Sequence, residues 1–65
     1  MNVNEHQPPA LLRLPEVKRR TGLSRSTVYK WMKEGQFPAH KQIGQRSVAW
    51  LEQDINQWIE GATHD

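Results

Sequence analysis

The chain has 65 residues and no cysteine, so its length allows one small domain without disulfide bonds or thiolate metal ligands. Its apolar runs are much shorter than the ~20 residues of a membrane span, and its polar start, MNVNEHQPPA, lacks the features of a signal peptide. These properties predict a soluble, cytoplasmic protein, and the formal net charge of +2 conceals an uneven distribution.

All nine basic residues lie between positions 13 and 46. Only two of the seven acidic residues lie in that segment, so nine positive and two negative charges give it a formal charge of +7. This asymmetry points to a polyanionic partner. Taken alone, the charge distribution is explained equally well by an ordinary solvated surface. The choice between these two interpretations depends on how the helices and strands arrange the basic residues.

Residues 1–10 contain Pro8-Pro9 and no periodic apolar pattern, which predicts a flexible arm. Residues 11–14, LLRL, are expected to form a short extended segment. A first helix of about two turns is then predicted from Pro15, because proline is tolerated in a first turn. Gly22 is the expected left-handed stop of that helix.

A second helix is predicted over residues 24–34, with Ser24 as its N-cap and Gly35 as its end. The apolar side chains expected to form its buried stripe, at i, i+3 and i+4 spacing, are Val28, Trp31 and Met32. So few residues separate the two helices that the chain has to turn sharply, as in a helix-turn-helix.

A small β-hairpin is predicted next, with strands over residues 39–43 and 47–50. Gly44 is expected to permit a turn with positive φ. The side chains expected to share one face of the hairpin are Ile43, Val48 and Trp50. The predicted fold class is mainly α with a small β-hairpin, a winged helix-turn-helix in one domain over residues 11–61.

The last element is predicted to be a helix with apolar spacing at Ile55, Trp58 and Ile59. Gly61 is its expected end, and residues 62–65 are expected to form a tail. The three tryptophans each lie on an apolar stripe, so core packing is favoured over stacking on nucleic-acid bases.

The outward face of the second helix combines basic and short polar side chains, which is typical of a helix that enters the major groove. Arginine can bind guanine bidentately, and hydroxyl groups can bind phosphates or base edges. The free N–H groups of a first helical turn also favour phosphate. The candidate DNA-binding residues on this helix are Arg25, Ser26, Thr27, Tyr29, Lys30 and Lys33.

Two further groups of residues are candidates for contacts with the DNA backbone. A basic hairpin tip beside a helix-turn-helix can reach phosphates or the minor groove, and the first helix crosses the backbone. The candidates in the hairpin and the first helix are Lys18, Arg19, Arg20, Lys41, Gln45 and Arg46. Each of these residues is also compatible with an ordinary solvated surface.

The segments LLRLPEVKRRTGLSRSTVYKWMKEGQFP, RSVAW and DINQWI resemble the AlpA family of prophage regulators. These are small winged helix-turn-helix proteins related to MerR-type DNA-binding domains and to phage excisionases. The resemblance implies that residues 24–33 read the major groove, that the loop of residues 44–46 is the wing, and that the protein has a role in prophage or genomic-island gene control or excision. A protein with this role is expected at the bacterial nucleoid.

The implied partner is double-stranded DNA. Neither a small-molecule effector nor binding to a membrane is expected. MerR-type proteins have a long dimerising helix after the wing that is not found here, so a monomer or a weak dimer is expected, with cooperativity on DNA left open.

Three functions remain open from the sequence: a transcriptional regulator, an excisionase that bends attachment-site DNA, and a protein-interaction module without DNA binding. An enzyme is not expected, because the sequence contains no paired carboxylates, nucleophile–base pair or phosphate-cradling glycine loop. The three histidines are far apart and share no ligand spacing, so neither a metal site nor a cofactor is expected.

Overall fold

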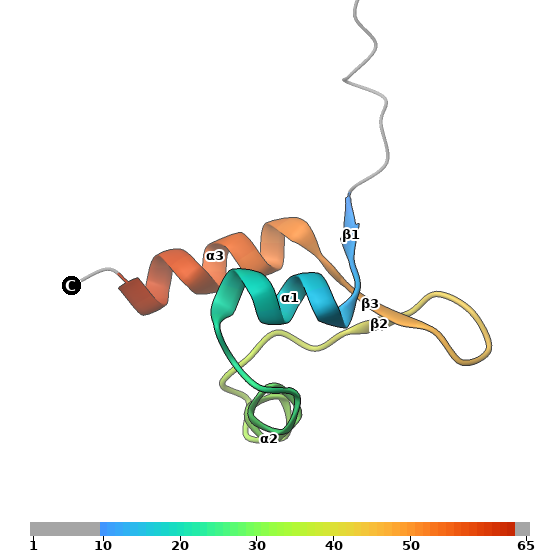
Figure 1. Cartoon of the computed structure of the whole chain (residues 1–65), viewed down its shortest axis with the longest axis horizontal. Coiled ribbons are helices and arrows are strands. Elements are labelled where there is room, and N and C mark those ends of the chain that lie inside the picture. The colour runs from blue at the N-terminus through green and yellow to red at the C-terminus, as the bar shows by residue number, and fades with distance from the viewer. Residues whose placement is uncertain (1–9, 64–65) are drawn as a thin grey trace, which may run out of the picture.

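Three helices and three short strands follow one another along residues 10–63, which are the residues described in the computed structural model of the chain (Figure 1). Residues 1–9 of the predicted arm and residues 64–65 of the predicted tail lie outside this part. The elements are β1 (Leu11–Leu12), α1 (Leu14–Thr21), α2 (Arg25–Lys33), β2 (Lys41–Gln42), β3 (Val48–Leu51) and α3 (Glu52–Thr63). The predicted class, mainly α with a β-hairpin, is confirmed.

Helices α1 and α2 are joined by a tight turn whose ends are both capped. Gly22 adopts a φ of 75°, and its N–H donates a hydrogen bond of 2.8 Å to the carbonyl of Lys18. Two residues later, the Oγ of Ser24 accepts a hydrogen bond of 3.2 Å from the N–H of Thr27, as an N-cap does. Figure 1 shows α2 along its axis while α1 lies across the view, so the two helices cross as in a helix-turn-helix.

The sheet has three antiparallel strands rather than the predicted two, in the order β1-β3-β2. Leu11 pairs with Leu51 on one side of β3, and Lys41 pairs with Ala49 on the other. The N–H of Glu52 extends the first pairing with a 2.9 Å hydrogen bond to the carbonyl of Ala10. Strand β1 is only two residues long, so the sequence pattern could not reveal its pairing.

The hairpin turn differs from the prediction in two ways. Gly44 does not adopt a positive φ; within residues 10–63, only Gly22 and Gly35 do. The turn is closed instead by a 2.8 Å hydrogen bond from the Ile43 N–H to the Ser47 carbonyl. Ile43 is 44% exposed, unlike the buried Trp50 with which it was expected to share a face, because it lies beyond Gln42, the last residue of β2.

Helix α3 follows β3 directly and runs through Gly61 to Thr63, so the predicted stop at Gly61 is wrong. A glycine within an exposed helix costs only about 1 kcal/mol relative to alanine, and neighbouring turns can offset this cost. The hydroxyl of Thr63 donates a 2.8 Å hydrogen bond to the carbonyl of Ile59, across the position of the glycine.

The core takes side chains from every element except β2. Its buried residues are Leu12, Val17, Val28, Phe37, Trp50 and Ile55. Trp50 is fully buried, whereas Trp31 and Trp58 are half-buried and pack against the edge of this cluster. The tryptophans thus pack on the core as predicted, but only Val28 of the predicted stripe on α2 is fully buried.

We predict that Trp50→Ala destabilises the fold by ~3–5 kcal/mol, as expected for a fully buried aromatic side chain. A loss of this size is comparable with the whole stability of a domain of this length. Trp31→Ala is the control, and its smaller expected loss reflects a side chain that is already partly exposed to solvent. Urea unfolding followed by circular dichroism tests this order, and an equal or greater loss for Trp31→Ala would contradict it.

Candidate nucleic-acid interface

The outer face of α2 carries the predicted recognition residues in two adjoining rows. Arg25, Tyr29 and Lys33 are four residues apart, and Ser26 and Lys30 form the second row. Of these five residues, all but Tyr29 are exposed. The helix has no acidic residue in its first turn, so the N–H groups at its N-terminus have no carboxylate of the same turn beside them.

Thr27, the sixth predicted residue of α2, is half-buried and takes part in the helix cap. Its Oγ1 accepts a 3.0 Å hydrogen bond from the Ser24 hydroxyl, and its N–H donates to the same serine oxygen. The requirements of the cap therefore account for a hydroxyl residue at this position without any nucleic-acid contact.

The wing consists of β2, β3 and the loop of residues 43–47 that joins them. Figure 1 shows it projecting beyond the helices, on the side away from the end of α3. Lys41, Gln45 and Arg46 are all exposed. The loop is held in shape by the side-chain amide of Gln42, which donates hydrogen bonds of 2.8 and 3.0 Å to the carbonyls of Gly44 and Gln45.

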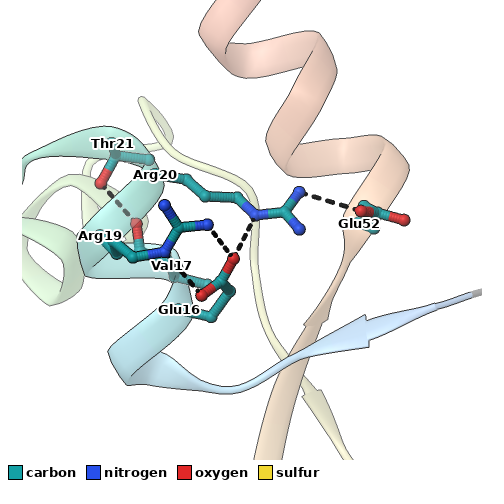
Figure 2. A network of polar contacts seen from close by, with 6 residues as sticks. All are labelled: Glu16, Val17, Arg19, Arg20, Thr21 and Glu52. Carbon is teal, nitrogen blue, oxygen red and sulfur yellow. Dashed lines mark hydrogen bonds and ion pairs between the residues drawn. The ribbon is translucent and has the colours of Figure 1, made fainter.

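Two of the three basic residues predicted on α1 belong to an ionic network (Figure 2). Arg19 donates two hydrogen bonds to the carboxylate of Glu16, at 2.9 and 2.6 Å. Arg20 lies between two carboxylates, 2.8 Å from Glu16 and 2.9 Å from Glu52. Lys18 is exposed and makes no ion pair within residues 10–63.

The network keeps its members charged. Hydrogen bonds from Arg19 and then Arg20 lower the pKa of Glu16 from 4.5 to about 2. The same contacts with Glu16 raise the pKa of both arginines, with Glu52 adding to the effect on Arg20. Arg20 therefore joins α1 to the start of α3, a link that the sequence did not reveal because its two ends are 32 residues apart.

The pairing divides the basic residues into two groups. Within residues 10–63, the ion pairs involve Arg19 and Arg20, and none involves a basic side chain of α2 or of the wing. Seven basic residues make no ion pair within residues 10–63, and five of them lie on α2 and the hairpin, whereas Arg13 directly precedes α1 and Lys18 lies within it.

His40 lies beside α2 and was not among the residues predicted to form the interface. Its ring centroid is 5.8 Å from that of Tyr29, and it immediately precedes β2. A histidine in a segment without periodic pattern gives no signal of such a contact. Only the fold brings the segment before β2 against α2.

Other kinds of site are poorly supported in the described residues. Between positions 10 and 63, no three His, Cys, Asp or Glu side chains come together in a way that could hold a metal ion. None of the described helices is long and apolar enough to cross a membrane. A surface hollow of about 450 Å³ lies between α3 and the turn after α2, and its lining includes Phe37 and Trp58.

A helix-turn-helix followed by a β-hairpin wing defines the class of winged helix-turn-helix proteins. Within this class, the family model described as "Prophage CP4-57 regulatory protein (AlpA)" matches residues 10–63, and the chain belongs to this family. The match covers the whole described part of the chain and confirms the resemblance seen in the sequence.

Two further proteins are similar to the chain, and one of them carries the name of the family. The chain is 33% identical over 63 residues to the DNA-binding transcriptional activator AlpA of Escherichia coli (strain K12), a match covering 88% of this chain and 90% of that protein. It is 44% identical over 50 residues to the uncharacterized protein ORF88 of Enterobacteria phage P4. That second match covers 77% of this chain, which spans 57% of the length of ORF88.

We predict that the network around Glu16 contributes to stability in a pH-dependent way. Because the folded pKa is about 2 and the ordinary value is 4.5, ionised Glu16 stabilises the fold above pH 4.5, and this contribution is lost as the pH falls toward 2. Glu16→Gln should therefore lower the urea midpoint at about pH 6 and have a much smaller effect at about pH 2.

Glu60→Gln is the matched control, because Glu60 is exposed on α3 and makes no ion pair within residues 10–63. This control variant should follow the wild-type pH profile. A pH-independent difference between Glu16→Gln and wild type would show that the carboxylate charge is not what stabilises the junction of α1 and α3.

Proposed function

We propose that this protein is a DNA-binding transcriptional regulator of prophage or genomic-island genes, and that α2 is its recognition helix. The observation that carries the proposal is the basic and hydroxyl-bearing outer face of α2, whose basic side chains make no ion pair within residues 10–63, in a helix-turn-helix with a capped turn. The relative named as a DNA-binding transcriptional activator supports the same class of activity. Such a protein works in the cytoplasm, on double-stranded DNA.

The proposed docking places α2 in the major groove, which is wide enough to admit an α-helix. Arg25 begins the helix and would read a base edge, since the N-terminal residues of a recognition helix contact bases. Ser26 and Thr27 are short enough to let the helix backbone approach the groove. Lys30 and Lys33 lie in the last turn, where they would contact flanking phosphates.

The wing adds a second contact in this proposal. Lys41, Gln45 and Arg46 are exposed around a loop that is braced by its own hydrogen bonds. A braced loop loses little entropy on binding, so its basic side chains can hold phosphates or enter the minor groove at low cost.

Helix α1 would contribute phosphate contacts of unequal strength. Lys18 is exposed and makes no ion pair within the described residues, and the side chain of Arg19 is 70% exposed although it is paired with Glu16. Arg20 is held by two carboxylates with its side chain 26% exposed, so it should contribute least to DNA affinity. One such domain would bind as a monomer or a weak dimer.

The proposal predicts DNA binding with strong salt dependence, because phosphate contacts release counterions. If about 4–6 phosphates are neutralised, log K should fall with log salt at a slope of about −0.9 per contact. Arg46→Ala should leave the fold intact and reduce the slope by about one unit. Fluorescence titrations of a labelled duplex at several salt concentrations measure both quantities.

The three candidate functions differ in how they are expected to bind DNA. If the wild-type protein binds neither DNA nor heparin at low salt, its function is that of a protein-interaction module. Tandem cooperative sites with bent DNA would indicate an excisionase, whereas a single site upstream of a gene would indicate a regulator. An unchanged slope for Arg46→Ala would assign the hairpin a purely structural role.

We further predict that Arg25 and Lys33 have different roles, although they lie in the same row of α2. Arg25→Ala should cost ~1–3 kcal/mol on the preferred sequence and relax the choice of one base pair. Lys33→Ala should weaken preferred and scrambled duplexes by similar factors, as loss of a phosphate contact does. Each variant is titrated against both duplexes, and an equal loss on both for Arg25→Ala would make Arg25 a phosphate contact.

A further inference from the structure

Tyr29 belongs to a cluster of three aromatic rings that joins α2 to the sheet. Its ring centroid lies 5.8 Å from that of His40 and 6.3 Å from that of Trp50, with interplanar angles of 67° and 69°. His40 and Trp50 are themselves 5.3 Å apart at 75°. All three contacts have the edge-to-face geometry that aromatic pairs prefer.

The base of this cluster is fixed. Trp50 is fully buried, and its indole N–H donates a 3.0 Å hydrogen bond to the carbonyl of Pro38. Pro38 lies two residues before His40, so the same contact holds the segment that carries the histidine. The Tyr29 ring therefore rests on two neighbours that have little freedom to move.

The same ring carries Arg25, one helical turn earlier. The guanidinium carbon of Arg25 lies 5.3 Å from the centroid of the Tyr29 ring, within the range of a cation–π contact. Arg25 is otherwise exposed and makes no ion pair within residues 10–63. Without the ring, its long side chain would sample many rotamers, and ordering it on DNA would cost entropy.

We infer that Tyr29 is a positioning residue, which holds the Arg25 guanidinium ready for base recognition through a ring that is itself held by His40 and Trp50. The inference rests on the proposed function and extends it, because it places the source of sequence selectivity partly outside the residues that touch DNA. In this mechanism the contact with Arg25 is made by the ring of Tyr29 and not by its hydroxyl, so a phenylalanine ring should also hold Arg25.

The first test needs no DNA and uses the full chain. The δ protons of Arg25 should show an upfield ring-current shift in the NMR spectrum, retained in Tyr29→Phe and lost in Tyr29→Leu. The leucine variant keeps apolar bulk on the core without an aromatic face. Ordinary random-coil shifts for Arg25 in the wild-type protein would overturn the inference.

The second test measures selectivity as the ratio of affinities for two duplexes, one selected by the wild-type protein from a randomised pool and the other a scrambled version. Tyr29→Leu should lower this ratio by roughly 2- to 5-fold, the range of an exposed cation–π contact, and by clearly more than Tyr29→Phe, which keeps the ring. An equal loss in both variants would make the hydroxyl a direct DNA contact and overturn the inference, as would no loss in either.

A double-mutant cycle identifies the route of the effect. If Tyr29 acts through Arg25, then Tyr29→Leu should lower the selectivity ratio no further in a protein that already carries Arg25→Ala. A full additional loss would show that Tyr29 acts independently and would also overturn the inference. If the wild-type protein selects no sequence at all, the proposed function fails, while the NMR comparison still decides whether Tyr29 positions Arg25.

Folding is monitored by circular dichroism at the temperature of the titrations, because Tyr29 is half-buried and packs on the core. If Tyr29→Leu is unfolded there, His40→Ala replaces it. This variant removes one support of the ring and leaves Tyr29 and Arg25 in place, so it should lower the selectivity ratio in the same direction. An unchanged ratio and an unchanged Arg25 shift in folded His40→Ala would overturn the inference.

Discussion

The hydrogen bond between the Trp50 indole and the Pro38 carbonyl anchors the segment that connects α2 with the wing. Trp50 lies on β3, which pairs with both other strands, and its ring also contacts Tyr29 of α2. Because the side chain is fully buried, leaving its N–H unsatisfied would carry a substantial penalty, so the contact fixes the path of the chain around it. One buried ring thus sets the position of α2 relative to the hairpin.

The distribution of charge complements this rigid frame. Glu16 and Glu52 compensate Arg19 and Arg20 on α1, where they also link the first and last helices. Helix α2 has no acidic residue in its first turn, and Glu34 is the residue that directly follows its last residue. Ion pairing therefore links α1 to the start of α3, and within residues 10–63 it leaves the basic side chains of α2 and of the hairpin unpaired, as the proposed binding of a polyanion requires. The net charge of the whole chain reports neither effect.

The parts of the fold set by local rules were predictable, and the parts set by long-range contacts were not. Gly22 and Ser24 bounded the helix-turn-helix correctly, since caps depend on residues close in sequence. The pairing of β1 with β3 and the helical conformation of Gly61 depend on distant or cooperative contacts, which a pattern of residue types does not record. The candidate surface on α2 could be predicted from helical spacing. The contact between the rings of His40 and Tyr29 could not, because only the folded chain brings these two residues together.

Under the proposed function, helix α2 contributes both to the core and to a DNA-binding surface, and each of its residues serves one of the two, with one exception. Val28 is fully buried, whereas Arg25 and Lys33 are exposed and support no apolar contact in the core. Substituting the exposed residues should change binding at little cost in stability, which matters in a domain whose total stability is small. Tyr29 is the exception, because its ring packs on the core and carries Arg25 at the same time. In the proposed function, stability and recognition are therefore coupled at Tyr29, and they can vary independently at the exposed positions of α2.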